Sequence, residues 1–270
     1  MKSGCLCLFL SIAANSPPTL LASVKLLVTV TESKTGKAIT NLKPEYFAAL
    51  DDGRPRQVEA VEYQTSLLDV MMLLDSSLVG EMVLPVAADL VRQLQPKEQM
   101  AIVAFHSSAD LVQEFTSSQD LLHRALRQVK FGNNPQVLDA VYAAADEGFA
   151  GATFRRAILL VTTGLEGSSR VSERSVIALA QKNGISIFPV YAVGAERSLF
   201  ETLARRTGGA SFSLRDLTKS RPGPSPAATI FETMRGAYVV TLGGNLRPTE
   251  RLKIEVKLPG RVFVSALPLD

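Results

Sequence analysis

The chain has 270 residues, of which 46% are hydrophobic and 20% are charged, so it has the length and composition of a globular protein with a buried core. Its 29 basic and 26 acidic residues leave a net charge of only +3, and no basic patch with interleaved aromatic residues is present in the sequence. These properties argue against a nucleic-acid-binding protein.

The N-terminal residues have the pattern of a secretory signal peptide. Lys2 precedes the short apolar run Cys5–Ala14, and small residues follow that run. Because the run is too short to span a bilayer, we predict a signal peptide over 1–23, a secreted or periplasmic mature chain, and no membrane span within it. Both cysteines, Cys5 and Cys7, lie in this segment, so the mature chain would have no disulfide and no thiolate metal site.

The two ends of the mature chain are rich in β-strand patterns. In the N-terminal β-segment, 24–64, apolar residues alternate over 24–31, and the residues 51–53 (Asp-Asp-Gly) are typical of a tight hairpin turn. The C-terminal segment, 230–270, begins with the end of a helix and continues with three strand-like runs. We expect the two segments to pair as a small β-sandwich, because exposed strand edges need partners.

Between these ends, residues 66–214 alternate strand-like apolar runs with helical periods. The predicted strands are 67–75, 100–106, 109–115, 156–163 and 185–194, and the predicted helices are 79–95, 118–129, 137–149, 173–183 and 198–207. This alternation predicts an α/β domain with a doubly wound, mostly parallel central sheet flanked by helices, of the Rossmann-like kind. Residues 215–229, rich in proline, glycine and serine, are predicted to be a loop.

One predicted strand of the central sheet ends in polar residues. A fully apolar run is followed by Asp75, Ser76 and Ser77. The carboxyl ends of parallel strands are where α/β proteins build their sites. An aspartate with serines suits a hard cation such as Mg²⁺, provided that the loops 131–136 and 162–169 supply further oxygen ligands.

Enzymatic alternatives have weaker support in the sequence. A serine hydrolase would use Ser77 and His106, but no G-x-S-x-G frame surrounds Ser77. The sequence contains neither the dinucleotide-binding pattern G-x-G-x-x-G nor the phosphate-binding pattern G-x-x-x-x-G-K-[ST]. We therefore expect a protein that is not an enzyme and has no cofactor, with a Ser77/His106 hydrolase as a remote alternative.

Eight motifs in order resemble the von Willebrand factor type A (VWA) domain, and more closely the bacterial VWFA-related proteins with the same flanking β-segments. The resemblance covers nearly the whole mature chain, and its motifs are VTVTESKTGKAITNLKPEYFAALDDGRPRQVEAVE, VMMLLDSS, AIVAFHSSADLVQEFTSSQDLLHRAL, VLDAVYAA, RRAILLVTTG, NGISIFPVYAVG, LARRTGG and AYVVTLGG followed by RLKIEVKLPGRVFV. It implies a VWA-like domain over 66–214 that serves protein–protein interaction.

The resemblance also implies a metal-ion-dependent adhesion site that is degenerate in this chain. The family pattern is D-x-S-x-S on the first loop, a threonine on the second and an aspartate on the third. Asp75 and Ser77 match it, whereas Val79, Pro135 and Thr163 stand at the other three ligand positions. The alternative is a remodelled site that binds Mg²⁺ weakly through Asp75, Ser77 and Thr163.

The expected function follows from the same resemblance. We expect an adhesion-like domain that recognises an unidentified protein partner without metal, through the loops at the carboxyl ends of the central strands. These loops, 76–81, 106–109, 131–137 and 163–172, are called the rim below. The candidate contact residues are Ser76, His106, Asn133, Asn134 and Glu166.

Overall fold

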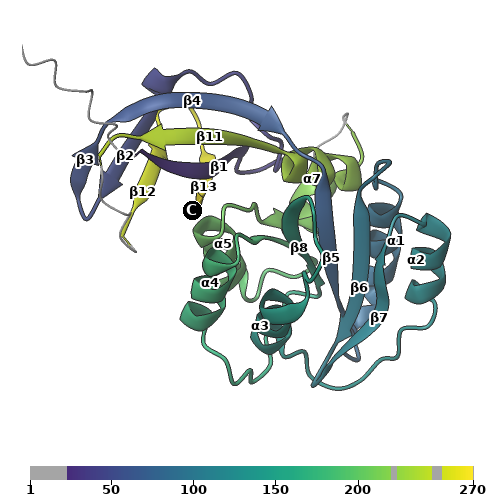
Figure 1. Cartoon of the computed structure of the whole chain (residues 1–270). Helices are drawn as coiled ribbons and strands as arrows, with labels where there is room; N and C mark the ends of the chain where they lie inside the picture. The colour runs from purple at the N-terminus through teal and green to yellow at the C-terminus, as the bar shows by residue number, and fades with distance from the viewer. Residues whose placement is uncertain (1–22, 220–223, 245–250, 270) are drawn as a thin grey trace, which may run out of the picture.

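The structure is a computed structural model that describes residues 23–219, 224–244 and 251–269 (Figure 1). The predicted signal peptide, 1–23, lies outside these residues except for its last position. No helix within the described residues has both the length and the apolar character needed to cross a membrane.

The central sheet has six strands in the order β10-β9-β8-β5-β6-β7. All neighbours are parallel except β7, which runs antiparallel to β6 at one edge. The strands are β5 (Leu68–Asp75), β6 (Gln99–Phe105), β7 (Ala109–Thr116), β8 (Arg155–Thr162), β9 (Ser186–Tyr191) and β10 (Phe212–Ser213). Every residue of β5 is buried, as expected for a central strand with helices on both faces.

Helices cover both faces of this sheet. They are α1 (Leu84–Val91), α2 (Gln119–Leu126), α3 (Val137–Glu147), α4 (Glu173–Lys182), α5 (Arg197–Arg206), α6 (Leu214–Lys219) and α7 (Pro226–Arg235), with 3₁₀ turns η1 (Pro44–Tyr46) and η2 (Gly80–Val83). Met72 and Leu74 of β5 belong to the core under α1, α2 and α7, whereas Met71 and Leu73 belong to the core under α3, α4 and α5. This alternation along the strand confirms the expected α/β class.

The segment predicted to be a loop, 215–229, is partly helical. Helix α6 runs to Lys219, and α7 begins at Pro226. The Ser225 hydroxyl accepts a hydrogen bond from Ala228 N at 3.1 Å and so caps α7, while Pro226 occupies the first turn, where the missing N–H is not needed. The serine and proline that favoured a loop are the start of a helix.

The strands from the two ends of the chain form antiparallel sheets that pack on each other. One sheet has the order β13-β1-β11-β4 and the other β12-β2-β3. The strands are β1 (Val24–Glu32), β2 (Phe47–Asp51), β3 (Arg54–Arg56), β4 (Val58–Thr65), β11 (Gly236–Leu242), β12 (Lys253–Val256) and β13 (Val262–Leu269). Their shared core includes Leu26, Val28, Phe47, Tyr238 and Ile254, so this unit, called the sandwich below, joins the two ends of the chain.

Two adjacent connections link the sandwich to the central sheet. Strand β4 leads into β5 and α7 leads into β11, and Ser66 N donates to Arg235 O at 3.1 Å between them. The Arg235 guanidinium donates to both carboxylate oxygens of the fully buried Glu98, at 2.8 and 2.6 Å. The amino end of β5 therefore faces the sandwich, and the rim lies at the opposite end of the sheet (Figure 1).

Candidate functional site

Asp75 is fully buried at the carboxyl end of β5, and protein donors occupy both of its carboxylate oxygens. Ser77 N donates to Oδ1 at 2.9 Å. Oδ2 accepts from Thr163 N at 2.9 Å, from Thr163 Oγ1 at 2.7 Å and from Thr162 Oγ1 at 3.1 Å. The carboxylate thus ties the end of β5 to the end of β8, and its buried charge is stabilised by four hydrogen bonds.

The two serines beside Asp75 are also buried. Ser76 is fully buried, so it does not reach the surface as the expected contact with a partner would require. Within the described residues, the hydroxyls of Ser76 and Ser77 have no hydrogen-bond partner. A buried hydroxyl without a partner costs about 1–3 kcal/mol, so a water molecule or a cation beside Ser77 would gain a favourable contact.

His106 and Ser77 do not form a catalytic pair in this structure. The Nδ1 atom of His106 accepts from Ser107 N at 2.7 Å and lies 3.0 Å from the Ser107 hydroxyl. The imidazole also packs on Gly132, where an added Cβ would lie only 2.6 Å from the ring. Glycine at this position therefore lets the third rim loop, 131–137, lie directly on the histidine ring.

Backbone hydrogen bonds join the rim loops to one another. Gly132 N donates to Ser76 O at 2.8 Å, Gln136 N to His106 O at 2.8 Å, and Gly167 N to Pro135 O at 2.6 Å. Each bond joins two different rim loops. The rim is therefore a single, preorganised surface rather than a set of independent loops.

Glu166 holds the fourth rim loop, 163–172, against the start of α3. Its carboxylate accepts from Val137 N at 2.9 Å and from Ser169 N at 3.3 Å. A carboxylate at this position complements the partial positive charge at the amino end of the helix. Burial raises the pKa of Glu166 above its usual value, although the hydrogen bonds that it accepts oppose this shift.

Of the five expected contact residues, Asn133 and Asn134 are exposed, His106 and Glu166 are half-buried, and Ser76 is buried.

Exposed apolar residues, which the sequence did not single out, are more prominent at this end of the sheet. Among the described residues, the large hydrophobic side chains exposed there are Leu78, Val79, Met82, Phe131, Leu165 and Val193. The remaining exposed ones are Tyr46, Leu111, Leu121 and Leu269. The Leu78-Val79 pair in a loop was the available sequence signal, and Leu78 is 76% exposed.

The donor set around Asp75 differs from the set that Mg²⁺ prefers. Val79 and Pro135 offer no side-chain oxygen, and the Thr163 hydroxyl donates to Asp75. Within the described residues no group of three or more His, Cys, Asp or Glu side chains is placed to hold a metal ion. A single carboxylate that already accepts four hydrogen bonds fits poorly to a cation that requires octahedral oxygen ligands and compensating charge.

Comparison with known proteins supports the fold. No protein-family model and no curated protein sequence matches the chain. Among solved structures, proximal thread matrix protein 1 from the mussel byssus matches with a TM-score of 0.53 and 15% identity, over 72% of this chain and 50% of the mussel protein. That protein has also been solved with a zinc-occupied MIDAS motif.

A second structure, an aerotolerance-related membrane protein from Bacteroides fragilis, matches with a TM-score of 0.48 and 14% identity, over 62% of this chain and 98% of that chain. The present chain spans half the length of the mussel protein. At 15% identity the match to the mussel protein shows a similarity of fold and nothing more, and that fold is of the VWA type.

Proposed function

We propose that this chain is an exported, non-catalytic member of the VWFA-related proteins that binds a protein partner through its rim without a metal ion. The observation that carries the proposal is the set of six exposed apolar side chains at the carboxyl end of the sheet. Exposed apolar side chains gathered at one end of a sheet are typical of an interaction surface. The proposed export rests on the sequence of residues 1–23.

The organisation of the rim supports recognition by shape and apolar contact. Because backbone bonds hold its loops together, a partner would bind a surface that is already ordered and would lose less conformational entropy on binding. Leu78, Val79 and Phe131 would bury apolar area against the partner, and the exposed Asn133 and Asn134 would supply hydrogen bonds.

A non-catalytic role agrees with the polar groups at the rim. Within the described residues, Ser77 has no hydrogen bond to His106 or to any other group that would activate it as a nucleophile. The carboxylate of Asp75 is engaged by Thr162, Thr163 and Ser77 and is fully buried. These contacts support a structural role for the residues that would otherwise be candidates for catalysis.

The rim is tested by placing a charge on it. The Leu78→Asp variant and the wild type would be used to capture cross-linked proteins from a periplasmic extract, with Leu111→Asp as the matched control. Leu111 is 58% exposed but lies on β7, outside the rim. A partner retained by the wild type and by Leu111→Asp but lost with Leu78→Asp is the expected result. Capture of the same proteins by all three would refute rim recognition.

The second candidate function, a remodelled Mg²⁺-dependent adhesion domain, is favoured by the unpartnered Ser77 hydroxyl next to Asp75. Thermal melting with increasing Mg²⁺ or Mn²⁺ separates the two candidates, because a cation that binds only the folded protein raises its melting temperature. We expect no shift at millimolar concentration. A saturable shift that the Ser77→Ala variant abolishes would instead establish the metal-dependent function.

A further inference from the structure

A cavity of about 220 Å³ lies on the flank of the central sheet, where the sandwich meets the α/β domain. It is enclosed by the turn after β1, helices α5 and α6, strand β10 and the start of β13. No described residue of the rim lines it. The cavity is therefore separate from the proposed partner-binding surface.

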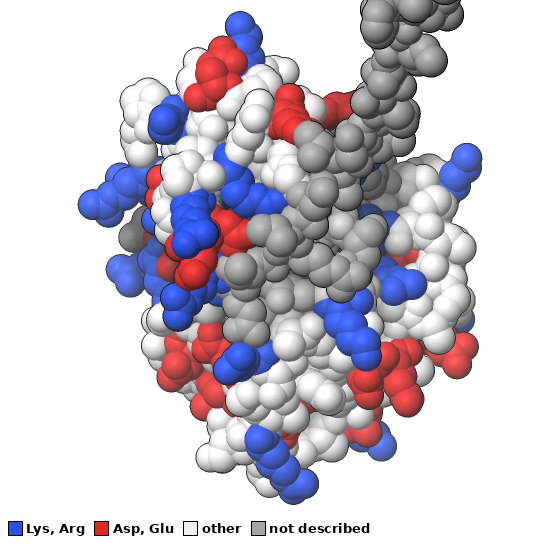
Figure 2. Space-filling model, turned by 60° about the vertical axis from the view of Figure 1, so that its left-hand side comes forward, with Lys and Arg blue, Asp and Glu red and all other residues white. Residues whose placement is uncertain are grey.

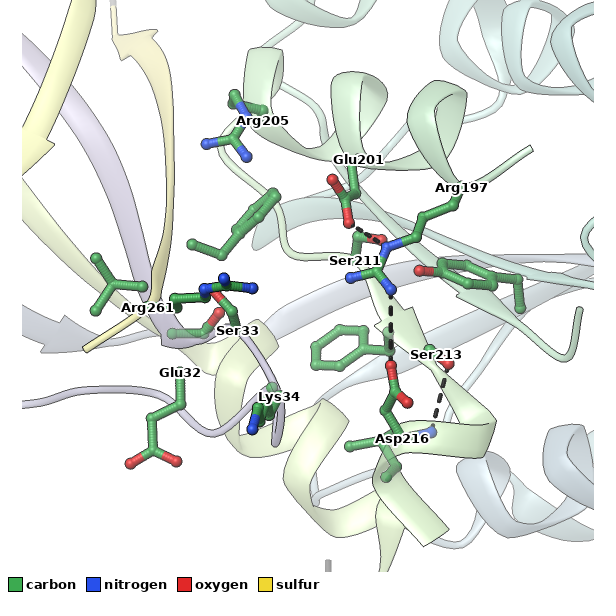
Figure 3. Close-up of a pocket in the computed structure, with 17 residues that line it drawn as sticks. Glu32, Ser33, Lys34, Arg197, Glu201, Arg205, Ser211, Ser213, Asp216 and Arg261 are labelled. Atoms are coloured by element: carbon green, nitrogen blue, oxygen red, sulfur yellow. Dashed lines mark hydrogen bonds and ion pairs between the residues drawn. The ribbon is translucent and has the colours of Figure 1, made fainter. Parts of the chain in front are cut away.

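Four cationic side chains reach this cavity from three separate segments of the chain (Figure 3). They are Lys34, Arg197, Arg205 and Arg261. Arg197 has its own counter-ions, because its Nε donates to Glu201 at 2.7 Å and its terminal nitrogen lies 3.8 Å from Asp216. The hydrogen bond to Glu201 raises the pKa of Arg197, and this charge is matched within the cavity wall.

Among the described residues, the other three cations have no carboxylate partner of this kind. Within the described part of the chain, Lys34, Arg205 and Arg261 form no ion pair with a carboxylate. The Glu32 carboxylate accepts from Thr35 Oγ1 at 2.7 Å and points away from the space between Arg261 and Arg197 (Figure 3). The lining as a whole has four cations against the carboxylates of Glu32, Glu201 and Asp216, so it has a small positive excess. Within the described ranges, none of these carboxylates pairs with Lys34, Arg205 or Arg261.

Arg205 is held in place for such a role. Its guanidinium carbon lies 4.4 Å from the centre of the Phe263 ring, and one terminal nitrogen donates to Val264 O at 3.1 Å. Stacking on an aromatic face fixes the plane of the guanidinium and lowers the entropy lost when it binds an anion.

The inner wall combines hydroxyl groups with apolar side chains. The Ser211 hydroxyl is buried beside the Tyr191 phenol, without the geometry of a hydrogen bond to it or to any other described group. Phe212, Leu217 and Phe263 form the apolar part of the lining. A ligand atom that accepts a hydrogen bond from Ser211 would satisfy this buried hydroxyl.

The surrounding surface favours a small ligand over an extended polyanion. Figure 2 shows the sandwich side of the molecule, where Lys and Arg side chains are interspersed with Asp and Glu rather than gathered in one basic field. The volume of the cavity is below the roughly 300 Å³ at which pockets for drug-sized ligands begin.

We propose that this cavity binds a small phosphate-class anion, either inorganic phosphate or a small phosphomonoester. Lys34, Arg205 and Arg261 contact the phosphate oxygens, and the Ser211 hydroxyl donates a hydrogen bond from the inner wall. A phosphate dianion matches several cations at once, whereas a single carboxylate leaves more of their charge uncompensated. The proposal goes beyond the partner-binding function and does not depend on it.

Isothermal titration calorimetry at constant ionic strength tests the proposal, with inorganic phosphate, phenyl phosphate and acetate as probes. We expect saturable binding of one or both phosphates and at least tenfold weaker binding of acetate. The Lys34→Ala and Arg261→Gln variants would each weaken phosphate binding about tenfold, the effect of losing one charge-assisted contact. Arg205 is left unchanged because it packs on Phe263.

The matched control is Lys37→Ala. Lys37 is exposed in the same turn as Lys34 but does not line the cavity, so this variant should bind phosphate like the wild type. Melting curves without phosphate show that each variant is folded. Absence of saturable binding, equal losses in the Lys34 and Lys37 variants, or acetate binding as tight as phosphate would overturn the proposal.

Discussion

Asp75 illustrates how protein donors alone can satisfy a buried carboxylate. In this chain the Thr163 backbone and hydroxyl both donate to the Asp75 carboxylate, and Thr162 adds a further bond. Thr163 thus supplies two donors to Asp75, one from its backbone and one from its hydroxyl. The carboxylate therefore links two strands and stabilises the fold.

The Asp75→Asn variant tests this role. In this variant the amide nitrogen replaces one of the two carboxylate oxygens. Because that nitrogen is itself a donor, it cannot accept the hydrogen bonds that the oxygen now accepts, and these buried bonds would be lost. We expect the free energy of unfolding to fall by about 2–4 kcal/mol, measured by urea denaturation. Asp110→Asn, an exposed residue on β7, is the control and should cost less than about 0.5 kcal/mol. Equal effects in the two variants would contradict the structural role.

At the same scale, the sequence located Asp75, Ser77 and Thr163 at adjacent strand ends but did not reveal their surroundings. The polarity of Ser76 suggested exposure, yet its position directly after a central strand buries it. Conversely, Leu78 lies in a loop with no core to enter and is exposed. Burial at a strand end depends on which loops cover it, and those loops are far away in the sequence.

Among the elements, strands and long helices followed from local periodicity, and the short elements did not. The predicted helix over 79–95 is a 3₁₀ turn followed by α1, which ends at Val91. Gly80 marks the turn, because an added Cβ there would lie 2.3 Å from Asp75 O. A periodic apolar pattern indicates which side is buried, but it does not distinguish a tight turn from the first turn of an α-helix.

We expect Glu166, which attaches the fourth rim loop to α3, to make the stability of the fold depend on pH. Its pKa is raised in the folded state, so the folded protein holds this proton more tightly than the unfolded chain. The contribution of Glu166 to stability is therefore most favourable below the usual glutamate pKa, and it falls as pH rises through the raised pKa.

We expect the Glu166→Gln variant to lose this contribution to the pH dependence. Between about pH 4 and pH 7, the urea midpoint of this variant should fall less with rising pH than the urea midpoint of the wild type. The control is Glu81→Gln, which changes an exposed glutamate of η2. A wild-type curve that matches Glu166→Gln throughout this range would show that Glu166 does not contribute to the pH dependence of stability.

In the whole molecule, β1 depends on strands from the other end of the chain. It lies between β11 and β13, and its register pairs Leu26 with Val240 on one side and with Pro268 on the other. The sequence predicted that the two ends pair, because both have unpartnered strand patterns. The order of the strands could not be predicted, since many antiparallel arrangements satisfy the same alternation.

Removal of residues 1–32 tests this dependence. Without β1, strands β11 and β13 lose their shared neighbour, and the core around Tyr238 is opened. We expect amides of β11 and β13 to exchange with solvent much faster, while amides of β5 and β8 stay protected by the helices on both faces. Full protection of β13 in the truncated chain would contradict the pairing.

The position of β1 also has a consequence for synthesis of the chain. The apolar residues of β1 are synthesised well before its two neighbouring strands, which begin at Gly236 and Val262. The α/β domain between them can fold in the meantime and bring Ser66 beside Arg235, which shortens the loop that pairing must close. Until β11 and β13 are complete, β1 is an apolar strand with two free edges, so we expect the newly made chain to be most prone to aggregation before these two strands pair with it.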